Sequence, residues 1–154
     1  MKTTGFFASL KIIHNGMLAC QILFIAILFY LGYTKIRIPT LNRLDETLQV
    51  VAIALCAIAF FGGGIFLKKK LIAIKEDKKN STKEKLHQYR VASIVQWAMF
   101  EITSLFCGLS YFFTGNFAFL ALAVVLMFLF AMLGPVKTKI IFQLGLNIAD
   151  AEEL

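Results

Sequence analysis

The positions of the charged residues constrain the fold of this chain more than any other feature. Residues 12–34, 47–67 and 91–136 together contain a single charged side chain, Glu101. About 20 helical residues cross the hydrocarbon core of a bilayer, which is about 30 Å thick. The first two stretches are therefore long enough for one transmembrane helix each, and the third is long enough for two.

The third stretch divides at Thr114-Gly115-Asn116, a combination typical of a turn. We expect spans at about 10–33, 48–67, 91–112 and 117–134. The predicted fold class is an all-α, polytopic membrane protein. Residues 1–134 would form a bundle of four transmembrane helices, and residues 135–154 a cytoplasmic juxtamembrane tail.

The composition excludes several classes of soluble protein. Hydrophobic residues make up 59% of the chain and charged residues 16%, with a mean hydropathy of +0.78. Soluble chains are closer to half and a quarter. A free cytosolic enzyme, a disordered tail and a secreted disulfide module are all inconsistent with these values.

The distribution of Lys and Arg predicts the orientation in the membrane. The N-terminus, the 68–90 segment and the tail carry two, nine and two of these residues, whereas the 34–47 loop carries three. We expect a protein of the inner (plasma) membrane with both termini in the cytoplasm. The net charge of +7 then lies at the membrane edges and would contact anionic headgroups, with no sign of nucleic-acid binding.

The 68–90 segment should be more than a linker. A helical stripe of apolar residues continues through its lysines, and Ser81 with Glu84 matches a capping box that begins a new helix. We predict that the second and third helices extend into the cytoplasm as a basic hairpin. The hairpin either contacts lipid or docks a partner.

Two shorter helices are expected at the membrane surface. Gly134-Pro135 should end the fourth span, and residues 136–146 resemble an interfacial helix with Ile140, Ile141 and Leu144 on one side. On the outer side, residues 39–48 could form another short helix.

Glu101 is the candidate functional residue inside the membrane. A charge at the centre of a bilayer costs at least about 2.5–3.5 kcal/mol, so an intramembrane carboxylate suggests a function. Desolvation favours its neutral form unless a cation or water approaches. The alternative is a protonated, structural Glu that hydrogen-bonds a neighbouring helix.

The depth of each polar residue in the membrane indicates which residues of the first span could contact the third span. Gln21 lies close to the level of Glu101 and Thr103, and His14 lies close to the level of Gln96. Since His14 and Gln21 are seven residues apart, they share one helical face. We therefore predict two contacts, His14 with Gln96 and Gln21 with Glu101.

Small residues mark close helix packing and offer a surface for a homo-oligomer or for another membrane subunit. These packing candidates are Ala52, Cys56, Ala59 and Gly63 on the second span, with Ser104 and Gly108 on the third. The Gly62–Gly64 run marks a further point of close approach.

The chain lacks the patterns of a catalytic or cofactor site. The two histidines lie at different depths, which argues against haem. There is no zinc-type His/Cys cluster, phosphate-binding glycine loop or Ser/His/Asp set. We expect no enzyme activity, no metal and no cofactor.

From Tyr89 onward the chain resembles a group of small four-span inner-membrane proteins of Bacteroidota-type bacteria. The resemblance rests on Tyr89-Arg90, Glu101, the 114–116 turn, Pro135 with Lys137, Lys139 and Ile140, and Leu144-x-Leu146. The group has Gly and Pro soon after the Glu and Arg before the Pro, where this chain has residues 102–103 and Gly134. The resemblance covers about half the chain and implies four spans but no activity.

Two functions remain open. The first is a non-catalytic scaffold or accessory subunit that contacts partners through the basic hairpin and tail. The second is a small transporter or proton- or cation-coupling subunit that uses Glu101. The order of the Gly62–Gly64 run, the hairpin and Glu101 is similar to proton-translocating rotor subunits, although the hairpin here is longer and the Gly repeat is absent.

Overall fold

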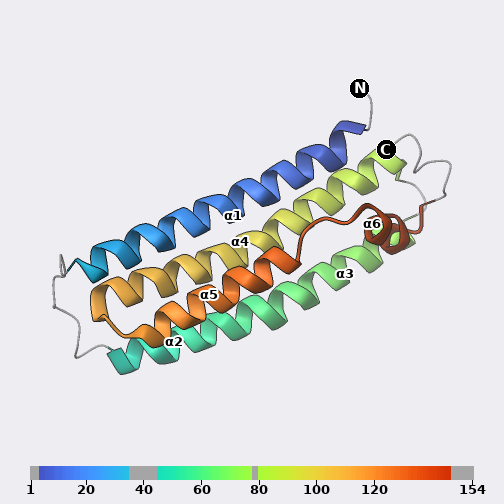
Figure 1. The fold of residues 1–154 in the computed structure, drawn as a ribbon. Helices are drawn as coiled ribbons and strands as arrows, with labels where there is room; N and C mark the ends of the chain where they lie inside the picture. The colour runs from blue at the N-terminus through green and yellow to red at the C-terminus, as the bar shows by residue number, and fades with distance from the viewer. Residues whose placement is uncertain (1–3, 35–44, 78–79, 147–154) are drawn as a thin grey trace.

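The computed structural model describes residues 4–34, 45–77 and 80–146. They form helices α1 (Thr4–Tyr33), α2 (Asp45–Ala57), the π-helical turn η2 (Ile58–Gly62), α3 (Gly63–Glu76), α4 (Thr82–Thr114), α5 (Phe117–Met132) and α6 (Lys137–Leu144). No β-strand occurs among these residues. Figure 1 shows the long helices running lengthwise: α1, α4, α5 and the continuous rod of α2, η2 and α3, which we call the α2–α3 rod. The short α6 lies at the end of the molecule where α1 begins.

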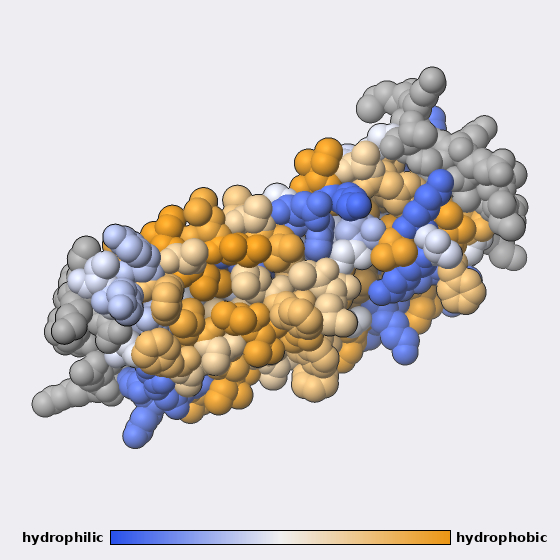
Figure 2. Space-filling view, viewed as in Figure 1, coloured by the Kyte–Doolittle hydropathy of each residue, from blue (hydrophilic) through white to orange (hydrophobic). Residues whose placement is uncertain are grey.

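Three helical segments are long and apolar enough to cross a membrane: Gly5–Tyr33, Asp45–Glu76 and Thr82–Thr114. A fourth is counted only if α5 and α6, which are bent by 72°, form one broken span. Figure 2 shows apolar side chains over most of the visible face, with hydrophilic ones near its left end and over part of its right half. These helices are those of a membrane-spanning protein.

The fourth expected span corresponds to α5, and it is shorter than predicted. Its 16 residues rise about 24 Å, less than the hydrocarbon core of about 30 Å. The helix ends at Met132 because Gly134 and Pro135 follow, and proline cannot continue a helix.

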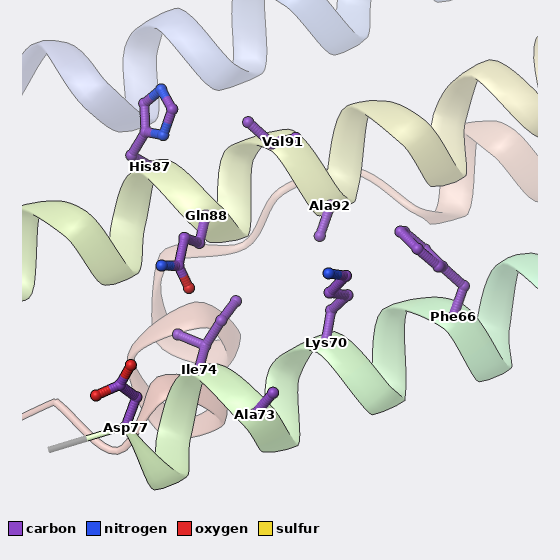
Figure 3. A pocket seen from close by; sticks show the side chains of 9 residues that line it. All are labelled: Phe66, Lys70, Ala73, Ile74, Asp77, His87, Gln88, Val91 and Ala92. Atoms are coloured by element: carbon purple, nitrogen blue, oxygen red, sulfur yellow. The ribbon is translucent and has the colours of Figure 1, made fainter. Parts of the chain in front are cut away.

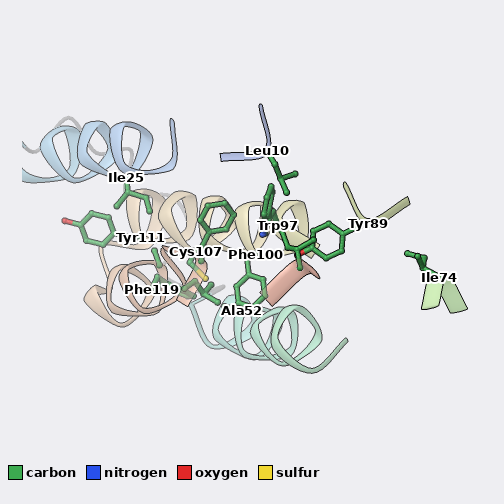
Figure 4. Packing of buried hydrophobic residues seen from close by; sticks show 14 of the residues in the cluster. Leu10, Ile25, Ala52, Ile74, Tyr89, Trp97, Phe100, Cys107, Tyr111 and Phe119 are labelled. Carbon is green, nitrogen blue, oxygen red and sulfur yellow. The ribbon is translucent and has the colours of Figure 1, made fainter. Parts of the chain in front are cut away.

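Helix α4 lies at the centre of the structure and packs against α1, α5 and the α2–α3 rod. Half of the residues in its apolar 18-residue stretch are buried. The corresponding share is 22% for α1 and 17% for the α2–α3 rod. Figure 4 shows the core that results, in which Trp97, Phe100 and Cys107 of α4 lie among side chains of the neighbouring helices. The candidate residues of the third span are thus positioned against three neighbours.

The predicted signals at both ends of α4 are confirmed. The Ser81 hydroxyl accepts from the backbone N–H of Glu84 while the Glu84 carboxylate accepts from the backbone N–H of Ser81, so the capping box is complete. At the other end, Gly115 adopts φ 75°, a conformation that favours glycine. The α3–α4 connection and the α4–α5 turn are therefore where the sequence places them.

Asn116 joins the α4–α5 turn to the start of the rod formed by α2, η2 and α3. Its Oδ1 accepts from the backbone N–H of Ala118 at 2.9 Å and caps α5. Its Nδ2 donates to Oδ2 of Asp45, 2.9 Å away in the first turn of α2. One amide therefore caps one helix and fixes the position of another.

Replacing Asn116 by alanine should reduce the free energy of unfolding by about 1–2 kcal/mol, because both the cap and the bond to a charged group are lost. The Asn116→Asp variant keeps the cap but sets two carboxylates against each other, so it should also destabilise. Asn15→Ala on the exposed face of α1 is the matched control. SDS-induced unfolding in micelles, followed by circular dichroism, measures all three. Equal midpoints for Asn116→Ala and the control would contradict the role of this amide.

The sequence did not predict the π-helical turn η2 in the α2–α3 rod. It spans Ile58–Gly62 and ends at the glycine run. Gly63 is buried against α4, where an added Cβ would lie 3.4 Å from Cγ of Gln96. Gly64 has open space at the same position. Close approach is therefore a property of Gly63, whereas Gly64 faces outward.

The helical extensions beyond the expected spans are also present. α3 continues to Glu76 and α4 begins at Thr82. The predicted helix after Pro135 is α6, whose Ile140 and Leu144 are buried while Ile141 is partly exposed. α6 packs against α3, with Gly145 close to the side chain of Lys75. The helix proposed near residues 39–48 falls mostly outside the described residues, and α2 begins at Asp45.

Candidate functional site

Aromatic and polar side chains from three helices meet at the C-terminal end of α5. Nε2 of His14 in α1 lies 3.1 Å from the carbonyl oxygen of Phe130, and Nε1 of Trp97 in α4 lies 3.3 Å from that of Leu133. The two rings are only 3% and 2% exposed. The His14 ring is parallel to the Phe130 ring at 4.7 Å and meets the Trp97 ring edge-on at 4.8 Å.

The chemistry of a helix end explains these two bonds. The last carbonyls of a helix have no donor within the helix, and Pro135 contributes no N–H. A carbonyl oxygen only accepts, so Nε2 of His14 must carry a hydrogen and donate it. We call the group of His14, Trp97, Phe130 and Leu133 the α5 end cluster. His14 gives the Phe130 carbonyl a second donor beside the backbone N–H of Leu133, whereas Trp97 supplies the donor to the Leu133 carbonyl.

The expected contact between His14 and Gln96 is not formed. Gln96 is buried on the side of α4 that faces Gly63. His14 instead contacts Trp97. Adjacent residues of a helix point about 100° apart, so Gln96 and Trp97 face different neighbours. The depth of the predicted contact was correct and the face of α4 was wrong.

Glu101 is half-buried on α4 and forms no hydrogen bond or ion pair with any described residue. Gln21 of α1 is 1% exposed, and neither its amide nitrogen nor its amide oxygen has a partner. The predicted Gln21–Glu101 hydrogen bond is therefore absent. Glu101 and Gln21 therefore both lack a partner among the described residues.

The register of α1 on α4 gives the relative depth of these two side chains. His14 contacts Trp97, and a Cβ on Gly108 would lie 3.3 Å from Leu28. Because the two helices run in the same direction, Gln21 lies at about the level of Ser104, one turn beyond Glu101. The two groups are thus close in depth, as expected.

The other predicted residues of α4 face three different neighbouring helices. Thr103 is buried but donates to the carbonyl oxygen of Met99 in its own helix, and it lines a small cavity toward α2. Ser104 is fully buried and donates to the carbonyl oxygen of Ala123 in α5 at 3.2 Å. Gly108 faces α1. The candidate polar residues therefore do not converge on one cavity.

The small residues of the α2–α3 rod lie mostly toward the interior of the structure. Ala52 and Ala59 are 0% and 1% exposed, and Gly63 is also buried. Cys56 is partly exposed and its thiol contacts Cys107 of α4. No disulfide forms among the three cysteines, all of which are described and free.

Two features of the α5 end cluster were visible in the sequence but were not connected. Trp97 is the single tryptophan, and a buried indole N–H requires an acceptor. Gly134 and Pro135 mark a helix end whose carbonyls require donors. Depth along the helices brings these groups together, so the cluster could have been sought.

Among the described residues, no group of three or more His, Cys, Asp or Glu side chains could hold a metal ion. The chain matches no protein-family model, no curated protein and no solved structure. Function must therefore be argued from the geometry.

Proposed function

We propose that this protein is a non-catalytic scaffold or accessory subunit of the inner membrane that crosses the bilayer four times. The observation that carries this proposal is the long helical hairpin of α3 and α4. Helix α4 has 33 residues, about 13 more than the bilayer requires, which corresponds to about 20 Å beyond the hydrocarbon core. A rigid extension of this kind presents a surface to partners.

The charges of the hairpin support cytoplasmic contacts. Lys68, Lys69 and Lys70 are exposed at the membrane edge, and Lys83 is exposed at the start of α4. Basic residues gather on the cytoplasmic side of membrane proteins. In this proposal the hairpin, both termini and α6 lie in the cytoplasm, and α5 crosses a locally thinned bilayer.

α6 would support the hairpin at the membrane surface. It packs against α3, its Phe142 is 84% exposed, and Lys137 and Lys139 are exposed beside it. An exposed aromatic ring next to cationic side chains is typical of a helix in the headgroup region. The α3–α4 hairpin and α6 together would form the partner-binding end of the molecule.

Orientation can be tested with single cysteines at Lys83 and Thr47, in a background where Cys20, Cys56 and Cys107 are replaced by alanine. Both positions are exposed and lie at opposite ends of the structure. In spheroplasts, a membrane-impermeant maleimide should label the Thr47→Cys variant at once and the Lys83→Cys variant only after permeabilisation. The reverse order would contradict the proposed orientation.

Partner contact can be tested with a photo-crosslinking amino acid at the same two positions in intact cells. The scaffold proposal expects a discrete protein adduct from position 83 and none from position 47. Reversing the charge of Lys69 should weaken the adduct, because this lysine lies on the same extension. A hairpin that crosslinks only to lipid would contradict the scaffold proposal.

A second candidate function, proton or cation coupling, is favoured by the two unpartnered groups, Glu101 and Gln21. Polar side chains left unpaired inside a membrane protein are costly and often functional. Water or a cation between α1 and α4 would satisfy the Gln21 amide oxygen and the Glu101 carboxylate together. This would give the protein an ion-coupling site at the level of Ser104.

Proton uptake into liposomes under a potassium diffusion potential tests this candidate. Coupling at Glu101 predicts that uptake in Glu101→Gln falls at least about tenfold, since the neutral amide carries no exchangeable acid proton. Thr103→Val, which changes a buried residue on another face of α4, should retain uptake. If wild-type protein transports no faster than protein-free liposomes, the coupling candidate fails.

A further inference from the structure

A cavity lies between α3 and α4 where the two helices leave the expected membrane. Its volume is about 320 Å³, and its walls include Phe66, Lys70, Ile74, Gln88, Val91 and Ala92. This is within the range of small-molecule sites. Phe66 and Ala92 mark the inner end of the cavity, and both lie next to the boundary of an expected span.

The polar groups of the cavity are at its cytoplasmic mouth. Figure 3 shows Lys70 and Gln88 pointing into the space between α3 and α4, whereas the His87 ring points away from α3. Asp77 also lines the mouth, two turns beyond Lys70, and its carboxylate accepts from Nδ2 of Asn80 at 2.9 Å. The cavity therefore has an apolar inner end and, toward its mouth, the Lys70 ammonium at the level of the lipid headgroups, with the Asp77 carboxylate two turns farther out beside its donor Asn80.

A second, smaller cavity continues along the same helix faces, deeper in the membrane. Its volume is about 180 Å³, and its walls include Ile58, Ala59, Met99 and Ile102. Gly62 lies between the two cavities, and an added Cβ there would meet only the ends of Ile58 and Met99 at 3.7 Å. The two cavities and Gly62 together define what we call the α3–α4 groove.

The dimensions of the groove match one leaflet of a bilayer. Lys70 and Ala59 are 11 residues apart in a continuous helical rod, which corresponds to about 16 Å along its axis. Half of a hydrocarbon core of about 30 Å is nearly the same length. A molecule with its charge at Lys70 and its apolar part beside Ala59 would therefore extend from the headgroup level to the bilayer centre.

We propose that the α3–α4 groove binds a phospholipid. The Lys70 ammonium and the Gln88 amide donate to the phosphate, and one acyl chain follows the groove past Gly62 to Ile102. Basic pockets between transmembrane helices are known to hold lipid headgroups. The inference rests on the proposed orientation only for assigning the lipid to the cytoplasmic leaflet.

The test is lipid retention by purified protein in detergent, with phosphatidylglycerol as the probe and native mass spectrometry as the readout. Wild-type protein should retain one phosphatidylglycerol molecule. Lys70→Gln should lower the apparent affinity at least about tenfold, because a bond between charged partners is lost. Lys69→Gln is the matched control, since this exposed neighbour does not line the groove.

A second pair of variants tests the apolar part of the site. Ala92→Trp fills the inner end of the cavity and should also reduce retention, whereas Val125→Trp on the exposed face of α5 should not. Equal retention by Lys70→Gln and Lys69→Gln would overturn the proposal. Displacement of the lipid by millimolar inorganic phosphate would also overturn it, since the site would then recognise free phosphate. Because this assay uses isolated protein, its failure is distinguishable from failure of the crosslinking experiment.

Discussion

Trp97→Ala should be among the most destabilising single substitutions in the α5 end cluster, lowering the free energy of unfolding by about 3–5 kcal/mol. The indole is 2% exposed and contacts the His14 ring, so its removal leaves a cavity between α1, α4 and α5. It also leaves the carbonyl oxygen of Leu133 without its donor. Packing and hydrogen bonding are therefore lost at the same point.

The measurement is SDS-induced unfolding in micelles, followed by circular dichroism because the variant lacks the single tryptophan. Trp97→Phe keeps most of the ring but not the N–H, and should lose only about 1–2 kcal/mol. Phe128→Ala is the matched control, since Phe128 is 68% exposed on α5. A Trp97→Ala midpoint as high as that of Phe128→Ala would show that the cluster does not stabilise the fold.

A double-mutant cycle would separate packing from hydrogen bonding in the cluster. His14→Phe preserves a flat ring against Phe130 but removes the donor to its carbonyl oxygen. Combined with Trp97→Phe, it leaves the carbonyls of Phe130 and Leu133, at the end of α5, without side-chain donors. Because the residues are in contact, we expect a coupling energy of about 0.5 kcal/mol or more.

The positions of the helices could be predicted from the sequence because the cost of burying charge decides them. The stretches without charge predict α1, the α2–α3 rod and α4. The cap residues Ser81 and Gly115 predict where α4 begins and ends. Each of these signals is local. A charge, a cap or a glycine acts within one turn, so no tertiary contact was needed to interpret it.

The rotation of each helix about its axis could not be predicted in the same way. His14 and Gln21 share a buried face of α1, as their spacing of seven residues predicts. That face meets Trp97 of α4, however, whereas the adjacent Gln96 faces the α2–α3 rod. Depth is fixed by the membrane, whereas rotation is fixed by packing against all neighbours at once. An error of one residue, about 100°, therefore exchanges one partner helix for another.

The other large effect is expected at Gly108, where α1 and α4 pack closely. A Cβ at this position would lie 3.3 Å from Cδ1 of Leu28 and 3.6 Å from Cγ1 of Ile25. A leucine would require about three further carbon atoms in space that these side chains occupy. Overpacking of this kind typically costs about 1–3 kcal/mol, and the small residues of membrane helices are the ones that permit close approach.

Gly16 on α1 provides the matched control, because an added Cβ there would have open space within 4 Å. Leucine has a higher helix propensity than glycine by nearly 1 kcal/mol, so Gly16→Leu should be neutral or stabilising. Gly108→Leu should be destabilising in the same SDS titration. The two substitutions are chemically identical, so their opposite signs would report the α1–α4 contact itself. If both variants unfold at the same SDS concentration, α1 does not pack on α4 at Gly108.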